Sequence, residues 1–274
     1  MSRIAIDLGF IQIYWYSIMI ALGILVGSFI ILFECKKQKI NEDFIVNLLF
    51  YGIIFGVIGA RLYYILFNIS YYRLHALEIF EIWNGGLAIH GGIIFATLFI
   101  FFYCKKNKQD FLKILDIIVV GLIAGQTIGR WGNFFNQEAF GTVVSLDFLK
   151  GLHLPQFVIN GMLIGGEYHH PTFLYESLWN LLGLLMLVIA RRFRYVKIGQ
   201  PTALYMIWYG LGRLIIEAFR TDSLMLGPFR IAQIVSIFMI IIGVALFVYK
   251  YRQSRFESRY NERKFKNSIS LNSN

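Results

Sequence analysis

The stretch from Ile13 to Phe33 reads IYWYSIMIALGILVGSFIILF and contains no charged side chain. A helix of this length rises about 1.5 Å per residue and spans the roughly 30 Å hydrocarbon core of a bilayer. Further apolar runs follow it at residues 44–68, 88–104, 113–131, 172–190, 201–219 and 229–249. Because these runs are continuous and do not alternate with polar residues, they predict helices and exclude a β-barrel.

The composition of the whole chain agrees with a membrane protein. Of its 274 residues 57% are hydrophobic and 15% are charged, and the mean hydropathy is +0.61. Soluble domains carry about 25% charged residues. A disordered chain, a coiled coil and a disulfide-stapled secreted domain are therefore excluded. Cys35 and Cys104 end two apolar runs without any metal-ligand spacing, so we interpret both as reduced residues without a chemical role.

The distribution of Lys and Arg predicts how the helices are oriented in the membrane. Lys and Arg follow the first, third, fifth and seventh runs, at residues 36–39, 105–113 and 191–197 and in the C-terminal tail. These clusters fall on one side if the N-terminus lies outside, and by the positive-inside rule that side is cytoplasmic. The net charge of +10 thus reflects membrane topology and does not indicate a nucleic-acid partner.

The sequence therefore predicts an all-α polytopic membrane protein with seven transmembrane helices. The N-terminus is expected outside and the C-terminus in the cytoplasm. We expect one transmembrane catalytic domain over residues 1–251, within which residues 132–171 form a small extracytoplasmic cap. Residues 252–274 form a polar cytoplasmic tail, and residues 69–87 suit an interfacial segment on the outer side.

Ionisable and polar side chains occur at one depth, in the outer part of the predicted bundle. A charge inside a membrane helix costs about 2.5–3.5 kcal/mol on insertion scales, so each needs a reason. These side chains come from different segments and are Tyr16, Arg61, His90, Arg130, Asn133, Arg213 and Glu217. Several guanidinium groups at headgroup depth favour a phosphate, which predicts an anionic phospholipid as the ligand.

Each of these residues also has a purely structural explanation. Arg213 and Glu217 stand four residues apart and suit a helix-stabilising ion pair. Arg61 suits a side chain that snorkels to the headgroups, and Arg130 suits a helix anchor. Tyr16 suits the aromatic belt, and His90 suits an interfacial histidine with satisfied hydrogen bonds. Together these explanations leave the shared depth of three arginines unaccounted for.

Several segments resemble signatures of the prolipoprotein diacylglyceryl transferase family. The most specific is GRWGNFFNQEAFG at residues 129–141, which resembles the family pattern GRxGNFxNxExxG. Four shorter segments also fit, namely WY at 15–16, HGG at 90–92, HPTFLYE at 170–176 and YGLGRLIIEAFR at 209–220. Asp116 and the segment GAR at 59–61 fit as well. The resemblance runs from the first apolar run to the last and leaves only the tail outside it.

The resemblance implies a bacterial plasma-membrane enzyme whose active site faces the outer leaflet. Its substrates would be phosphatidylglycerol and the lipobox cysteine of a prolipoprotein signal peptide. The products would be a thioether-linked diacylglyceryl group and glycerol phosphate, and neither a metal nor an organic cofactor is expected. The residues expected to bind phosphatidylglycerol, with Arg61 added from its depth, are Arg61, Arg130, Asn133, Glu138, Tyr209, Arg213 and Glu217.

The chemistry of the reaction suggests roles for four catalytic candidates. Arg130 and Arg213 would stabilise the negative charge that develops on the leaving phosphate. His90 is the candidate base for the incoming thiol, because the pKa of histidine lies near neutrality. Tyr16 is a further candidate for proton transfer in the active site, and a phosphate oxygen of the lipid remains an alternative base.

Two other classes of protein make different demands on the sequence. A lipid flippase would spread charges through both leaflets and often shows internal symmetry, whereas the inner halves of these runs are almost purely apolar. An intramembrane protease would need a Ser–His pair or paired aspartates at one depth. Ser17, Ser28 and Ser177 have no evident partner of this kind. The transferase is therefore the leading hypothesis.

Replacement of His90 by Gln tests the proton-transfer hypothesis. We expect His90→Gln to lower turnover strongly between pH 6 and 8, on the order of 10²-fold, because a general base contributes about that much. The measurement is the initial rate of lipid transfer to a cysteine peptide across this pH range. Full turnover in the variant at every pH would assign the proton to another group.

Overall fold

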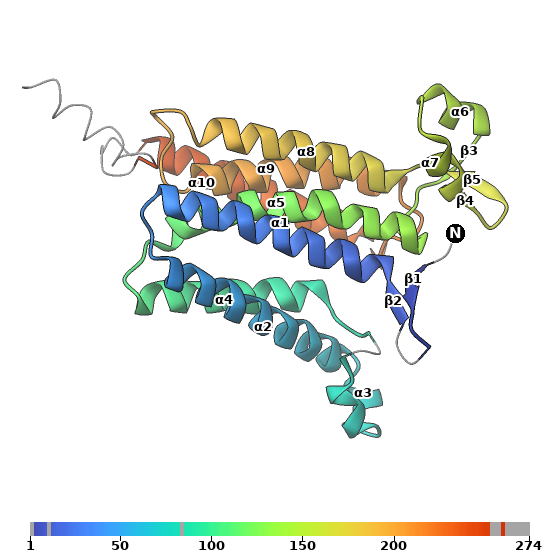
Figure 1. Ribbon diagram of the computed structural model, residues 1–274, viewed down its shortest axis with the longest axis horizontal. Helices are drawn as coiled ribbons and strands as arrows, with labels where there is room; N and C mark the ends of the chain where they lie inside the picture. The colour runs from blue at the N-terminus through green and yellow to red at the C-terminus, as the bar shows by residue number, and fades with distance from the viewer. Residues whose placement is uncertain (1–2, 10–11, 83–84, 253–258, 261–274) are drawn as a thin grey trace, which may run out of the picture. The chain divides into compact units, whose positions relative to one another are not determined.

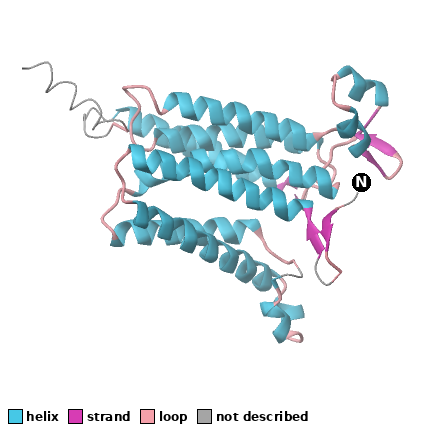
Figure 2. Ribbon diagram, viewed as in Figure 1, coloured by secondary structure: helices cyan, strands magenta, loops and turns pink. Residues whose placement is uncertain are grey.

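The computed structural model describes residues 3–9, 12–82, 85–252 and 259–260 (Figure 1). The chain divides into two compact units, the first of Met1–Ile31 with Leu115–Asn274 and the second of Leu32–Ile114. Most of the described residues are helical, and short strands and turns connect the helices (Figure 2).

Every predicted apolar run forms a helix. These helices are α1 (Trp15–Lys37), α2 (Glu42–Phe67), α4 (Ile89–Lys106), α5 (Phe111–Asn136), α8 (Thr172–Ala190), α9 (Gln200–Ile216) and α10 (Ile231–Arg252). Among the described residues, six helices are long and apolar enough to cross a membrane, and α9 is shorter, with 17 residues. The chain is therefore a helical multi-pass membrane protein.

Two of the helix ends that differ from the predicted positions lie near the predicted site residues. Helix α5 continues to Asn136, so Arg130 lies inside the helix and does not end it. The reason is that Phe134, in the last turn, is buried in the hydrophobic core of the following segment. Helix α9 ends at Ile216, and Glu217–Phe219 forms a 3-10 turn, η3. The chain then pairs with residues 140–142 through a bond from the Thr142 amide to the Phe219 carbonyl (2.9 Å), which ends the helix.

Close backbone contacts hold the helices of the first unit together. A Cβ on Gly27 would lie 2.6 Å from the carbonyl oxygen of Gly121, and one on Gly23 would lie 2.9 Å from that of Gly125. Helices α1 and α5 thus meet along small residues, as membrane helices commonly do. Helices α8 and α9 meet at Trp179 and Trp208, whose rings stack at 4.5 Å and whose indole N–H groups each donate to the other's carbonyl at 2.9 Å.

A buried carboxylate on α5 binds the amides at the start of α9. Asp116 on α5 is fully buried, and it accepts hydrogen bonds from the backbone amides of Gly199 (2.6 Å) and Thr202 (2.9 Å) and from the Thr202 hydroxyl (2.6 Å). The first amides of a helix have no partner within the helix, and a negative charge there is stabilised by the helix dipole. Gly199 has φ of 93°, a left-handed conformation that favours glycine.

The predicted cap forms a small folded segment at one end of α5 and α8 (Figure 1). It contains α6 (Leu146–Gly151), α7 (Gln156–Gly161) and the antiparallel strands β3 (Val143–Val144), β4 (Leu163–Ile164) and β5 (Glu167–His169) in the order β3-β5-β4. The first unit also has two hairpins, of β1 (Ile4–Asp7) with β2 (Gln12–Tyr14) and of β6 (Met225–Leu226) with β7 (Phe229–Arg230). These strands are too short for an alternating pattern to predict them.

The second unit is a pair of helices with a short arm. Helices α2 and α4 pack against each other, and a Cβ on Gly91 would clash with the Gly59 carbonyl oxygen and with Tyr63 Cβ. Between them the chain forms α3 (Ile69–Tyr72) and the 3-10 helix η1 (Ala76–Phe80). The predicted tail, 252–274, lies mostly outside the described residues; the Tyr260 amide donates to the Val196 carbonyl at 2.8 Å.

Replacement of Gly91 by Ala tests the close contact between α2 and α4. We expect Gly91→Ala to lower the free energy of unfolding by about 1–3 kcal/mol, because the new methyl group has no space. The matched control is Gly52→Ala, whose Cβ would meet only Phe99 Cδ1 at 4.0 Å. Thermal unfolding of both variants in detergent measures the difference, and equal stability would contradict the contact.

Candidate active site

Glu176 joins two of the predicted arginines. Its carboxylate on α8 binds Arg130 Nε of α5 at 2.5 Å through one oxygen and Arg213 Nη1 of α9 at 2.6 Å through the other. The Glu176 side chain is 7% exposed, and the side chains of Arg130 and Arg213 are 19% and 18% exposed. Three helices that are distant in sequence therefore meet at one carboxylate in a largely buried position.

The charged cluster continues along the C-terminal end of α9. Arg213 Nη2 lies 2.8 Å from the carboxylate of Glu217, so the ion pair weighed as a structural alternative is present. Arg230 donates to the backbone carbonyl of Glu217 through Nη1. Arg220 forms a bidentate pair with Asp222, at 2.9 and 3.0 Å. Such pairing is what allows charges to remain ionised away from water.

Arg130 also faces a tyrosine on α9. Its Nη2 donates to the Tyr209 hydroxyl at 3.5 Å, and the ring of Tyr209 stacks on that of Tyr205 at 5.7 Å. Gln126 donates to the Tyr205 hydroxyl at 2.9 Å, which fixes the second ring. No acceptor among the described residues binds Nη1 of Arg130, so this group can serve a ligand.

Three more of the predicted residues, Asn133, Glu138 and Tyr16, lie near the C-terminal end of α5. Asn133 donates to the carboxylate of Glu138 at 2.9 Å, and the Glu138 amide donates to the Asn133 carbonyl at 3.1 Å. Tyr16 packs on Gly132, where a Cβ would lie 2.9 Å from the tyrosine ring. Gly132 is therefore the residue that lets the Tyr16 ring approach the α5 backbone.

His170, which is not among the predicted site residues, lies two residues before the start of α8. His170 Nδ1 is 3.1 Å from the Tyr175 hydroxyl, and its ring lies 5.4 Å from that of Phe219. Burial lowers the pKa of His170 below its usual range, since the charged form loses solvation. The lowered pKa favours the neutral imidazole, which suits hydrogen bonding more than charge pairing.

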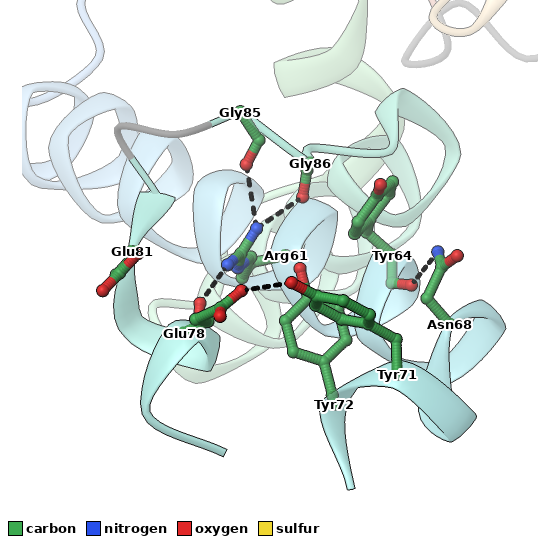
Figure 3. A pocket seen from close by; sticks show the side chains of 9 residues that line it. All are labelled: Arg61, Tyr64, Asn68, Tyr71, Tyr72, Glu78, Glu81, Gly85 and Gly86. Carbon is green, nitrogen blue, oxygen red and sulfur yellow. Dashed lines mark hydrogen bonds between the residues drawn. The ribbon is translucent and has the colours of Figure 1, made fainter. Parts of the chain in front are cut away.

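Arg61 and His90 belong to the second unit. Arg61 is 7% exposed and donates to the backbone carbonyls of Glu78, Gly85 (2.8 Å) and Gly86 (3.2 Å) (Figure 3). It also donates to the carbonyl of Ile79 at 2.9 Å. This gives Arg61 partners within the protein, and its predicted contact with lipid stays a prediction. His90 is the second residue of α4, is exposed, and lies 6.3 Å from the Tyr63 ring.

The predicted site residues thus form two groups. The first unit holds Tyr16, Arg130, Asn133, Glu138, Tyr209, Arg213 and Glu217, and the second holds Arg61 and His90. Glu176 was missed as a site residue, although it is the central carboxylate. A signal was present, because Glu176 is the only acidic residue in the apolar run 172–190 and ends the segment HPTFLYE.

The hollow that borders Arg213 and Glu176 is small. The hollow lined by Glu176, Tyr209 and Arg213 measures about 10 Å³, which holds one water molecule at most. A phosphate therefore enters only if these side chains move. Among the described residues, no group of three His, Cys, Asp or Glu side chains is placed to hold a metal ion.

Comparison with known proteins gives a consistent result. A sequence profile of the family described as prolipoprotein diacylglyceryl transferase matches residues 3–249. The phosphatidylglycerol–prolipoprotein diacylglyceryl transferase of Staphylococcus saprophyticus is 46% identical over 93% of this chain and 92% of its own length. Proteins of the same name from Listeria innocua and Bacillus cereus are 44% and 42% identical, over 91% and 96% of this chain and 90% and 97% of their own lengths.

Replacement of Glu176 by Gln tests the shared carboxylate. We expect Glu176→Gln to lower the free energy of unfolding by about 3 kcal/mol, because the largely buried Arg130 loses its carboxylate partner and Arg213 keeps only Glu217. Glu138→Gln is the control, since Glu138 is exposed and its bond to Asn133 survives the change. Thermal unfolding in detergent compares the two, and an equally small effect in both would contradict a central role for Glu176.

Proposed function

The chain belongs to the prolipoprotein diacylglyceryl transferase family, and from this premise we propose that Arg130 and Arg213 bind the phosphate of phosphatidylglycerol in the active site. The chain is a transferase that moves the diacylglyceryl group of phosphatidylglycerol onto a prolipoprotein, the first step of lipoprotein lipidation. The observation that carries the proposal is the convergence of two guanidinium groups, from α5 and α9, on one anionic group.

The reaction sets the demands on the site. The thiolate of the lipobox cysteine attacks the carbon of the diacylglyceryl group that bears the phosphate ester. A carbon–sulfur bond forms, the carbon–oxygen bond breaks, and glycerol phosphate leaves with the electron pair. The thiol proton passes to a base, for which His90 is our candidate. The negative charge on the leaving phosphate grows during the step, so groups that bind it more tightly in the transition state accelerate the reaction.

The arginines suit this leaving group. A guanidinium binds phosphate and carboxylate oxygens through the same planar donors, so the Glu176 carboxylate marks a place that a phosphate oxygen can take. The hollow there is small, which means that binding requires the Glu176 contacts to loosen. Glu176 would then hold the two arginines in position and offset their repulsion while the lipid is absent, and the phosphate would take over this role when it binds.

The neighbouring residues have supporting roles in this proposal. The Tyr209 hydroxyl accepts a hydrogen bond from Arg130, and the Asn133–Glu138 pair offers polar groups to the lipid headgroup at the end of α5. Tyr16 lies against the same helix and is a candidate for proton transfer. We place the active site toward the outer leaflet of the bacterial plasma membrane, because the basic clusters lie at the opposite ends of the helices.

Replacement of Arg213 by Lys tests the phosphate-binding role. Lysine keeps the charge but lacks the planar fork that binds Glu176 and Glu217 together, so we expect a loss of kcat/KM on the order of 10²-fold. The assay contains purified protein, labelled phosphatidylglycerol and a lipobox peptide carrying either Cys or Ser. If lipid is transferred to the Cys peptide and not to the Ser peptide, the nucleophile is the cysteine thiol.

The control for this experiment is Arg252→Lys, an equivalent change at the exposed end of α10. It should leave the transfer rate unchanged. If Arg213→Lys transfers lipid at a rate near that of the unmodified protein, the phosphate-binding proposal is wrong, while the membership of the family is unaffected.

A further inference from the structure

The arm of the second unit, residues 69–82, carries an exposed apolar stripe. Leu74, Leu77 and Phe80 are 83%, 84% and 74% exposed. They are spaced by three residues, and the 3-10 helix η1 has about 3.0 residues per turn, so Leu77 and Phe80 lie one above the other. Leu74 precedes them at the same spacing. Single exposed leucines are common, but a contiguous stripe of large apolar side chains indicates a contact surface.

The other side of the arm is polar. Glu78 borders a cavity of about 350 Å³ together with Tyr64, Asn68, Tyr71 and Tyr72 (Figure 3). The Tyr71 hydroxyl donates to the Glu78 carboxylate at 2.8 Å, and this bond raises the pKa of Tyr71. The arm is therefore amphipathic, with its carboxylate at the cavity and its leucines and phenylalanine on the outside.

Arg61 holds this arm to α2. The hydrogen bonds from its guanidinium to the carbonyls of Glu78 and Ile79 anchor η1, and those to Gly85 and Gly86 anchor the turn before α4. Because η1 is anchored through its own backbone, the apolar stripe has a defined direction relative to α2. It is not a loose loop whose side chains point at random.

We infer that the stripe of Leu74, Leu77 and Phe80 inserts into the lipid surface at the membrane boundary and anchors the arm there. The arm connects the C-terminal end of α2 to the N-terminal end of α4, two helices that qualify as membrane spans, so both of its ends lie at that boundary. The helix ends on either side of the arm also carry exposed apolar side chains, Phe67 (74% exposed) and Ile89 (70% exposed). An amphipathic segment of this kind lies in the interface plane with its apolar side in the acyl region.

A protein partner fits the stripe less well. Stable protein interfaces bury about 800 Å² on each partner, and three side chains fall short of that area. A lipid surface has no such minimum, since each apolar side chain that enters it contributes separately. The insertion would keep the Gly85–Gly86 turn, and with it the first turn of α4 that bears His90, at headgroup depth.

Spin labels at neighbouring positions test the insertion. Leu77→Cys and Glu78→Cys are labelled separately with a nitroxide in the full-length protein, reconstituted in bilayers of phosphatidylglycerol and phosphatidylethanolamine. The native Cys35 and Cys104 are fully buried, and the unsubstituted protein gives their background labelling. We expect the label at Leu77 to be several-fold more accessible to oxygen and several-fold less accessible to a water-soluble nickel chelate than the label at Glu78.

Two results would overturn the inference. Equal nickel accessibility at both positions would mean that the arm stands in water. Protection of the Leu77 label from both oxygen and nickel would mean that protein covers the stripe, and spin–spin broadening would identify a second copy of the chain. Leu74→Cys repeats the measurement independently if the label at Leu77 disturbs folding, and the transfer assay checks that each labelled protein is native.

Discussion

The carboxylate of Glu176 is the interaction on which the arrangement of the first unit depends. It binds one arginine through each oxygen, at 2.5 and 2.6 Å, and so ties α5, α8 and α9 at one point. A buried charge is tolerated only when its partners are close and well oriented. Arg213 in turn binds Glu217, so two arginines and two glutamates balance in a region that the helices largely shield from water. The same groups that make the fold possible carry the charge that the proposed reaction needs.

In the second unit, the hydrogen-bonding groups of the buried Arg61 are satisfied by backbone carbonyls and not by a carboxylate. Arg61 binds four backbone carbonyls, and no ion pair with it is present among the described residues. Carbonyl dipoles spread the charge without adding a counter-charge, which suits a residue that holds a turn. The contrast separates two kinds of arginine that look alike in an apolar sequence. Arg130 and Arg213 form ion pairs with the side chain of Glu176, whereas Arg61 is bound by backbone carbonyls.

The positions of the helices could be predicted well from the sequence, and their ends less well. Continuous apolar runs identify α1, α2, α4, α5, α8, α9 and α10 because a lipid environment demands helices of that length. The extension of α5 to Asn136 could not be predicted, since it depends on Phe134 packing in the cap. The end of α9 at Ile216 depends likewise on pairing between residues 140–142 and the chain after Phe219. Both features require contacts between distant segments.

The sequence by itself determined that this chain crosses the membrane many times and that its basic clusters follow every second apolar run, and from these it predicted a common depth for the charged residues. These properties follow from position along a helix, because rise per residue and apolar length set depth. Only the tertiary structure decided which charges meet. Glu176 was not recognised as the partner of Arg130 and Arg213, because the rotation of each helix about its axis, set by contacts such as Gly27 on Gly121 and Trp179 on Trp208, determines which faces come together.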